Sequence, residues 1–535
     1  MKRLLTAALW MLSLGVFGQS LSVELEPITI ADMYGAHSFA TAIDDDGRWL
    51  IIGGRVDGLH RRQPFAAFLE EDNHKNVLVV DINNNSFHTA ALDVLPTPLF
   101  EQLQSTNPNF HQRENTLYFV GGYGYSATVD DHITYPNVTA ISVNELCEAV
   151  VNGEDITPFF RQITFEDLAV TGGQMGYIEG TFYLMGGQYF EGRYNPMGPD
   201  MGPGFIQEYT DAVYRFEIED DGTEMAVVNF QETVDTPVLH RRDYVAAPQI
   251  FPDGTKGFTM FSGVFQIDQD IPWLTSVDVL SNSHAENTAF QQYLNHYHCA
   301  KIPVFFEQSN TMATLFFGGM SRYYYDDEGV LIDDVNGPFV KSIGLVERYS
   351  DGTMTEYWIG NMPGFLGSGA EFMLNPDLNF DNNGLLTLPG DIAEPILAGY
   401  IIGGIECGQE NIFFINDGTQ SAAHTTIYEV WLSQGVTNVE SLAVEDQNLL
   451  QLSVFPNPTQ GALTVSYFCP TARTTATVEI VAENGALVKS YEVNNAMSGY
   501  VDIDIDTDSL ATGSYVINLT VGDHTGQTRF IRKAN

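Results

Sequence analysis

A short apolar run that ends in a pair of small residues recurs six times along this chain, and this recurrence constrains the fold more than any other feature. The pair is Gly-Gly in five runs and Ser-Gly in the fourth, and the runs lie at residues 51–54, 118–122, 183–187, 259–263, 315–319 and 400–404. A strand followed by residues that tolerate positive φ, repeated every 55 to 85 residues or so, is typical of small sheets stacked around an axis. We therefore predict an all-β fold, a six-bladed β-propeller.

Each apolar run is expected to be the second of four strands in a blade. In the first unit the four strands are predicted near residues 37–41, 49–53, 76–81 and 86–92. The sixth unit falls one strand short. The N-terminal segment 22–30 is predicted to supply that strand, because a ring closed by strands from both termini leaves no exposed edge.

The two ends of the chain differ from this repeat. Residues 1–18 combine a charged start with a short apolar stretch, which is the pattern of a secretory signal peptide. That stretch is too short to span a bilayer, and no later one is long and apolar enough, so we predict no transmembrane segment. The predicted organisation is then a propeller at 19–435, a linker at 436–449 and a second domain at 450–535.

The chain is strongly acidic. It carries 69 Asp and Glu against 23 Lys and Arg, which gives a formal net charge of −46 at pH 7. Such a surface repels nucleic acid, so we exclude a nucleic-acid partner, and it suits solubility in a salty extracellular medium. The cysteines are too scattered for a disulfide framework or a structural zinc site. One disulfide bridge among them is still possible. The cysteines are Cys147, Cys299, Cys407 and Cys469.

The repeat resembles the kelch family, in which a Gly-Gly pair ends the second strand of each unit and aromatic residues follow. Trp358 and Trp431 fall near the positions of the later aromatic residues, while Ser262 replaces the first glycine of the fourth pair. The units here are longer than kelch repeats, so the loops between strands are expected to be long. Long loops are where binding surfaces are built.

The last 86 residues follow another pattern, with short alternating strands expected at 463–467, 476–481 and 488–493. Many short strands joined by Gly and Asn turns predict a small β-sandwich. The segment strongly resembles the type A C-terminal sorting domain of the type IX (Por) secretion system of Bacteroidetes. The matching residues are 454–458 with Gly461, Asn484-Gly485, 510–516 and the basic end 529–533.

This resemblance implies export across the outer membrane by the type IX secretion machinery, through residues 450–535. The sorting domain is then commonly removed or exchanged for a surface anchor. The expected location is therefore secreted or on the cell surface.

Polar residues precede or begin the first strand of every predicted blade. The innermost strands of a propeller line its central channel, so these residues are expected to meet at the channel mouth and bind a ligand there. The candidate ligand-binding residues are His37, Asn107, Gln174, Arg242, Asp243, Tyr244, His298 and Glu371. The alternative is that they bond to one another and to channel water, and so hold the blades in register.

Two local clusters suggest more specific chemistry. The guanidinium group of Arg242 could grip a ligand carboxylate, or it could pair with Asp243 or Glu371. His296 and His298 would face the same side of a strand and could share a metal. Galactose oxidase, a copper enzyme with a kelch-like propeller, makes that composition suggestive. No second set of ligands is identifiable, so we expect neither metal nor cofactor.

We find no HExxH, GxSxG, phosphate-binding loop or sialidase box. The leading hypothesis is therefore a secreted or surface-displayed kelch-type propeller that binds a glycan or protein ligand without turning it over. The alternative is a carbohydrate-active enzyme, either a galactose-oxidase-like metal oxidase or a sialic-acid-type epimerase with Arg242 as carboxylate clamp. A structural role in the surface layer is the third possibility. Propellers host many functions, so the fold does not choose among them.

Overall fold

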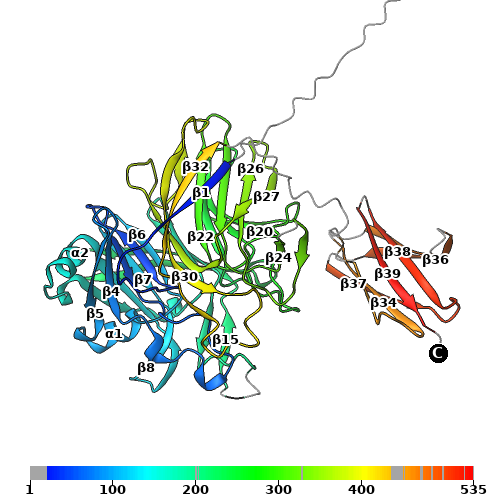
Figure 1. Cartoon of the computed structure of the whole chain (residues 1–535), viewed down its shortest axis with the longest axis horizontal. Coiled ribbons are helices and arrows are strands. Elements are labelled where there is room, and N and C mark those ends of the chain that lie inside the picture. Colours follow the sequence, from blue (N-terminus) through cyan, green and yellow to red (C-terminus); the bar gives the residue numbers. More distant parts are fainter. Residues whose placement is uncertain are drawn as a thin grey trace, which may run out of the picture. The chain divides into compact units, whose positions relative to one another are not determined.

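The computed structural model describes residues 21–198, 202, 204–326, 329–434, 450, 452–469, 474–482, 486–496, 499–522 and 524–533. The chain forms two compact units that divide between Ser441 and Leu442, and each is described by itself. Both are built of strands (Figure 1). The predicted signal peptide and linker lie outside the described residues. In the described part, no helix is long and apolar enough to cross a membrane.

Among the described residues of the larger unit, six mainly antiparallel sheets follow one another along the chain, and their strands are ordered outward from an inner strand. Sheet 1 contains β2 (Ala40–Ile43), β3 (Trp49–Ile52), β4 (Asn76–Asp81) and β5 (Ser86–Ala91). Sheet 2 contains β6 (Asn109–Arg113), β7 (Thr116–Val120), β10 (Asn137–Ser142) and β11 (Phe160–Thr164). Sheet 3 contains β12 (Gln174–Ile178), β13 (Thr181–Met185), β16 (Ala212–Asp220) and β17 (Met225–Val234).

The remaining three sheets repeat this order. Sheet 4 contains β18 (Val245–Ile250), β19 (Lys256–Phe261), β20 (Ser276–Val279) and β21 (His284–Asn287). Sheet 5 contains β22 (Ala300–Phe306), β23 (Thr311–Phe317), β26 (Ser342–Arg348) and β27 (Met354–Asn361), with β29 (Leu386–Leu388) parallel to β22. Sheet 6 contains β28 (Phe365–Leu374), β30 (Ile396–Cys407), β32 (Ile427–Gln434) and β1 (Leu21–Ile28), with β31 (Ser421–Ala423) beside β30.

Shorter elements occupy the loops. Three hairpins are formed by β8 (Tyr123–Ser126) with β9 (Asp131–Thr134), β14 (Gln188–Glu191) with β15 (Ile206–Tyr209), and β24 (Tyr323–Tyr325) with β25 (Leu331–Asp333). The α-helices are α1 (Thr97–Leu103), α2 (Val143–Asn152) and α3 (Thr236–Leu239). The long loops predicted from the repeat spacing are therefore partly ordered as hairpins and short helices.

The N-terminal strand completes the sixth sheet, as predicted. β1 pairs antiparallel with β32 along its whole length, from Leu21 opposite Gln434 to Ile28 opposite Ile427. The first and last strands of the larger unit are thus joined directly, which removes a free edge.

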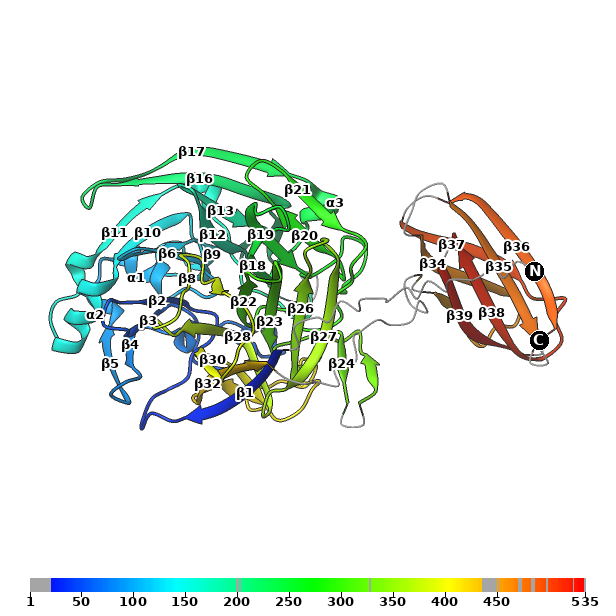
Figure 2. The same cartoon turned by 90° about the horizontal axis from the view of Figure 1, so that it is seen from above.

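A closed cycle of backbone hydrogen bonds joins the six sheets near the starts of their inner strands. Each N–H donates to the carbonyl of the next residue in the series Ser38, Gly369, His298, Asp243, Gly172, Asn107 and back to Ser38, at 2.8–3.1 Å. We call these six residues the axial ring. Figure 2 shows the inner strands gathered around one centre, with the outer strands at the periphery. The predicted β-propeller is confirmed.

The recurrent small pairs are explained by close approach of neighbouring sheets. Both residues of each pair have positive φ, including Ser262 at 57°. In five of the six pairs the second glycine donates to the chain leading into the next sheet, as in Gly122 N–H to the Val170 carbonyl at 3.1 Å. A Cβ on Gly121 would clash with the same carbonyl oxygen. The pair is therefore required by the contact between sheets, not only by the turn that it makes.

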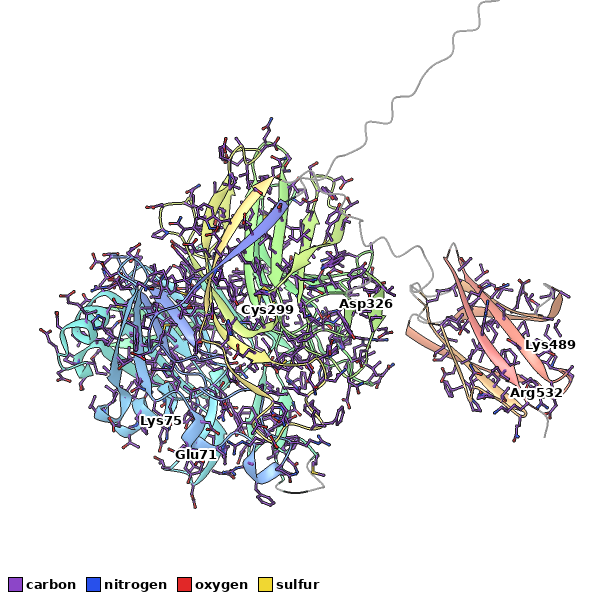
Figure 3. The ribbon with its side chains drawn as sticks, viewed as in Figure 1. Glu71, Lys75, Cys299, Asp326, Lys489 and Arg532 are labelled. Atoms are coloured by element: carbon purple, nitrogen blue, oxygen red, sulfur yellow. The ribbon has the colours of Figure 1, made fainter. Side chains whose placement is uncertain are left out.

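The cysteines of the larger unit form no bridge. Cys147 and Cys299 are buried, Cys407 is half-buried, and all three are free thiols. Cys299, labelled in Figure 3, immediately precedes β22 and is fully enclosed. The side chain of Cys469 lies outside the part that the structure describes.

The smaller unit is the predicted β-sandwich. One sheet contains β33 (Ser453–Phe455), β34 (Ala462–Cys469) and β37 (Gly499–Asp506). The other contains β36 (Leu487–Ala496), β35 (Thr474–Ala482), β38 (Gly513–Val521) and β39 (His524–Arg532). Side chains of both sheets share one core, which includes Leu463, Val465, Val478, Ile480 and Ile517.

Candidate functional site

A cavity of about 400 Å³ lies on the propeller axis and is lined by residues of all six sheets. It begins at the axial ring and continues along the inner strands. Its polar lining includes Thr41, Asn107, Asn109, His111, Gln174, Asp243, His298, Lys301 and Glu371. Phe110, Met175, Phe258 and Phe372 add apolar surface. The cavity therefore combines hydrogen-bonding groups with flat apolar walls.

Five of the eight residues predicted to bind a ligand line this cavity. They are Asn107, Gln174, Asp243, His298 and Glu371. Asn107, Asp243 and His298 belong to the axial ring, so their backbones are fixed by the cycle of hydrogen bonds. Counting back from each Gly-Gly pair thus located the start of the inner strands, and the axial ring explains why these side chains lie close together.

Polar side chains meet across the cavity. His298 Nε2 lies 2.9 Å from Glu371 Oε1, and the two side chains are only 18% and 9% exposed. Lys301 Nζ donates to Gln174 Oε1 at 3.3 Å, which joins β22 of sheet 5 to β12 of sheet 3. These two contacts place a carboxylate, an imidazole, an ammonium and an amide around one space.

Four buried polar atoms in the cavity wall have no hydrogen-bond partner among the described residues, and two of them, His298 Nε2 and Glu371 Oε1, form the ion-pair contact given above. The other two belong to Asn109 and His111. Asn109 donates through Nδ2 to the carbonyls of Val120 and Val170, but its Oδ1 is unpaired. His111 Nε2 is also unpaired. Burial and, to a lesser extent, the charge of Arg113 together lower the pKa of His111 to about 4, so the imidazole is neutral at pH 7. Unpaired buried polar atoms are costly, so a guest that bonds to them is stabilised.

Asn109, His111 and Lys301 were missed by sequence reasoning. The available signal for Asn109 and His111 was alternation, because they lie two residues apart on β6 and side chains two apart along a strand share a side. Alternation from His298 gives residues 300 and 302, so this signal does not reach Lys301 on β22.

A loop from sheet 6 crosses the end of the channel away from the axial ring. We call residues 378–385 the strap. Asn383 Oδ1 accepts the N–H of Tyr177 at 2.8 Å, and its Nδ2 donates to the Tyr177 carbonyl at 2.7 Å. Tyr177 lies on β12 of sheet 3, which is opposite sheet 6 in the cycle of six. Asp381 Oδ1 holds the strap turn by accepting the N–H groups of Asn383 and Leu385.

The axial ring narrows the other end. Hydrogen-bonded strands lie about 4.8 Å apart, and six such steps place the ring backbone about 5 Å from the axis.

Arg242 lies outside this cavity, contrary to the predicted clamp. Its guanidinium group forms an ion pair with Asp243, and its Nε donates to the hydroxyl of Tyr209 at 2.9 Å. It also lies over the rings of Tyr209 and Phe265. The guanidinium group is already paired with a carboxylate and covered by two aromatic rings, so it is not free to hold a ligand carboxylate.

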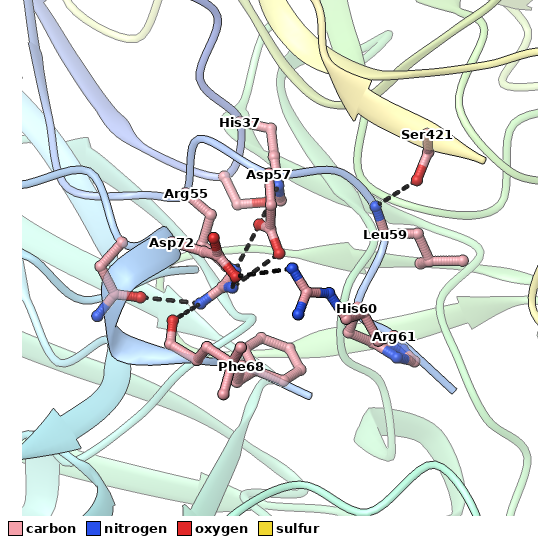
Figure 4. A network of polar contacts seen from close by, with 12 residues as sticks. His37, Arg55, Asp57, Leu59, His60, Arg61, Phe68, Asp72 and Ser421 are labelled. Atoms are coloured by element: carbon pink, nitrogen blue, oxygen red, sulfur yellow. Dashed lines mark hydrogen bonds and ion pairs between the residues drawn. The ribbon is translucent and has the colours of Figure 1, made fainter. Parts of the chain in front are cut away.

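His37 belongs to a polar network on the ring side (Figure 4). Its Nδ1 lies 3.1 Å from Ser38 Oγ, and its Nε2 lies 3.7 Å from Asp57 Oδ1. Arg55 Nε donates to Asp57 at 2.8 Å. Burial opposes ionisation of Asp57, but the contact with His37 and the hydrogen bonds and charge of Arg55 outweigh it and lower the pKa of Asp57 to about 2. The network holds the loop that follows β3 and does not line the cavity.

Tyr244 and His296 are structural residues. Tyr244 is fully buried in the core shared by sheets 3 and 4, and its hydroxyl donates to the Met185 carbonyl at 2.7 Å. His296 Nε2 donates to the Gln292 carbonyl at 3.0 Å, and its Nδ1 accepts the N–H of Arg322. Residues 296–298 precede β22 and are not in a strand, so the expected alternation does not apply.

His296 and His298 therefore bond to different parts of the protein and do not face one metal position. Within the described ranges, no group of three or more His, Cys, Asp or Glu side chains is arranged to hold a metal ion.

Residues 453–533 match the family described as the secretion system C-terminal sorting domain. The chain carries a type IX secretion sorting domain. The resemblance seen in the sequence is thereby confirmed, and the sorting domain directs the protein to the cell surface or the extracellular space. The matched residues coincide with the β-sandwich from β33 to β39.

Solved structures similar to this sorting-domain protein include YjhT, with 11% identity over 76% of this chain and 97% of that chain and a TM-score of 0.42. A fungal alcohol oxidase of the AA5 family in complex with copper has 10% identity over 95% and 98%, with a TM-score of 0.36. PorZ, a surface component of the type IX secretion system of Porphyromonas gingivalis, has 10% identity over 92% and 81%, with a TM-score of 0.13. None of the curated proteins compared by sequence matches the chain.

Proposed function

We propose that this exported propeller binds a glycan without catalysing a reaction on it, and that one or two sugar units of the glycan lie in the axial cavity. The observation that carries the proposal is the pair of unpaired buried atoms, Asn109 Oδ1 and His111 Nε2, in the cavity wall. Leaving such a group unpaired costs about 1–3 kcal/mol, which a ligand hydroxyl recovers by donating to it. Small-molecule sites are commonly ~300–1,000 Å³, and a cavity of about 400 Å³ suits one or two sugar units.

The chemistry of the remaining wall supports the same class of ligand. Glu371 supplies acceptors, Lys301 supplies donors, and Gln174 supplies both. Sugars carry hydroxyl groups that both donate and accept, so they match a wall of mixed character. Phe110 and Phe372 offer aromatic faces for the C–H side of a sugar ring.

The enzyme hypotheses receive less support from the same geometry. A clamp on a carboxylate needs a free guanidinium group, and Arg242 is already paired with Asp243. A metal oxidase needs free imidazole nitrogens, and both nitrogens of His296 are bonded to the protein. The contact of His298 with Glu371 is the feature that most resembles an acid–base pair. The cavity offers no activated nucleophile among its described residues, so we favour binding.

Titration calorimetry on the chain from residue 19 to 535, guided by a glycan array, tests this proposal. His111→Phe keeps the ring shape and removes the polar atom, so affinity for the bound glycan should fall about tenfold. His88→Phe is the matched control, because His88 lies half-buried on the outer strand β5. Failure of every glycan to bind, or binding that His111→Phe leaves unchanged, would sink the proposal.

A further inference from the structure

Lys301 is the one lysine or arginine among the described residues that line the axial cavity. It lies on β22 next to the start of the strand, and its side chain reaches past sheet 4 to Gln174 on sheet 3. The hydrogen bond to the amide oxygen is 3.3 Å long, and the amide carries no charge. The ammonium group is therefore held in the cavity by a neutral partner.

The absence of a counter-ion is unusual in so acidic a chain. The sequence has three times as many acidic as basic side chains, 69 against 23. In the described part of the structure, no carboxylate oxygen lies within 4 Å of Lys301 Nζ, although Lys75 pairs with Glu70 at 2.8 Å. A partly buried ammonium group without a counter-ion favours an anion as its guest.

The other charges of the cavity limit that guest to a single negative charge. Asp243 is paired with Arg242, and Glu371 contacts His298. Glu114 and Asp381 also line the cavity. A dianion such as a phosphate would gain one ammonium group and meet several carboxylates, whereas a monoanion gains the same contact with less repulsion.

We propose that Lys301 makes the axial cavity selective for a sugar that carries one carboxylate, a uronic acid residue. The assignment rests on the proposed function, because it names the substrate class of the same cavity. The ligand carboxylate accepts a hydrogen bond from Lys301 Nζ and takes the place of the Gln174 amide oxygen as its partner. The sugar hydroxyls then bond to Asn109 and His111.

Matched pairs of sugars test the selectivity by titration calorimetry on the chain from residue 19 to 535. The probes are glucuronate with glucose, and galacturonate with galactose, each as a short oligosaccharide. The acidic member should bind about tenfold tighter at low salt, and added salt should weaken its binding more than that of the neutral member.

Two variants separate the role of the charge from damage to the fold. Lys301→Met keeps most of the side-chain length, and it should lower affinity for the acidic sugar about tenfold and affinity for the neutral sugar by a smaller factor, so that the preference for the acidic sugar falls. Gln174→Glu retains Lys301 and places a carboxylate within its reach, so it should weaken acidic binding by internal competition. Lys256→Met is the control, because Lys256 is exposed at the start of β19.

The outcomes are distinguishable. Neutral sugars that bind as tightly as acidic ones, or a Lys301→Met variant with unchanged selectivity, would overturn this assignment and leave the proposed function standing. If no sugar of either class binds, the proposed function fails and the assignment fails with it.

Discussion

The N–H of Ser38 donates to the carbonyl oxygen of Gly369 at 2.8 Å, and this bond closes the axial ring between the first and last sheets. Gly369 has a φ of 70°, and a Cβ at this position would lie 2.6 Å from Ser38 Oγ. The ring therefore depends on a residue without a side chain at its closing step.

Gly369→Ala should lower the free energy of unfolding by about 1–3 kcal/mol, through backbone strain and the clash with Ser38. Chemical denaturation followed by circular dichroism measures the loss. Gly222→Ala is the control, because Gly222 also has positive φ but has open space around it. Equal losses in the two variants would mean that the closing step of the ring contributes nothing specific.

The clamp between Asn383 and Tyr177 gives a second prediction. Asn383→Ala removes both hydrogen bonds to the Tyr177 backbone, so hydrogen exchange should speed up at the Tyr177 amide and across the strap. Stability should fall by about 1–2 kcal/mol. Asn382→Ala, one residue away and exposed, should leave exchange at Tyr177 unchanged. Unchanged protection in Asn383→Ala would show that the strap is held by other contacts.

The fold was predictable because it requires small residues where neighbouring sheets meet, and these residues are visible in the sequence. Each sheet packs directly against the next, and only small residues with positive φ fit at the contact. A pair of small residues therefore recurs in the sequence at each contact between sheets. The closing strand was also predictable, because residues 22–30 alternate and the sixth unit was incomplete.

The site was only partly predictable, because adjacent residues leave the axial ring in different directions. Arg242, Asp243 and Tyr244 are consecutive, yet Arg242 contacts the Tyr209 hydroxyl, Asp243 lines the cavity and Tyr244 lies in the core. Residue spacing alone does not predict the directions of these three side chains, because the directions depend on the backbone conformation. The strap escaped prediction for a related reason, since its contact joins residues 206 positions apart through a single side chain.

Asp57 gives a prediction at low pH. Its pKa is lowered from 3.8 to about 2 in the folded protein, so its contribution to stability is present above its unfolded pKa and is lost as the pH falls toward 2. Asp57→Asn should cost about 2 kcal/mol at pH 7 and much less near pH 2. Denaturation midpoints at the two pH values provide the measurement. A cost that does not depend on pH would show that the lost contacts, not the charge, determine the effect.

Glu356 gives the opposite pH dependence. It is fully buried, and its carboxylate accepts the N–H groups of Tyr293 at 2.6 Å and Leu294 at 3.1 Å. Burial raises its pKa from 4.5 to about 8, and the two hydrogen bonds offset this only in part. Between these two pKa values the folded state binds a proton that the unfolded state releases. The contribution of Glu356 to stability is therefore greatest below pH ~4.5 and declines as the pH rises to about 8.

Glu356→Gln should flatten that decline when unfolding free energies are compared at pH 5, 7 and 9. A residual slope is expected, because burial also raises the pKa of Glu347 to about 7. Glu219→Gln, on the half-exposed end of β16, controls for the loss of one carboxylate from an acidic chain. If Glu356→Gln and the unaltered protein lose the same stability between pH 5 and 9, the buried carboxyl is ionised in the folded state throughout, and its two N–H donors outweigh its burial.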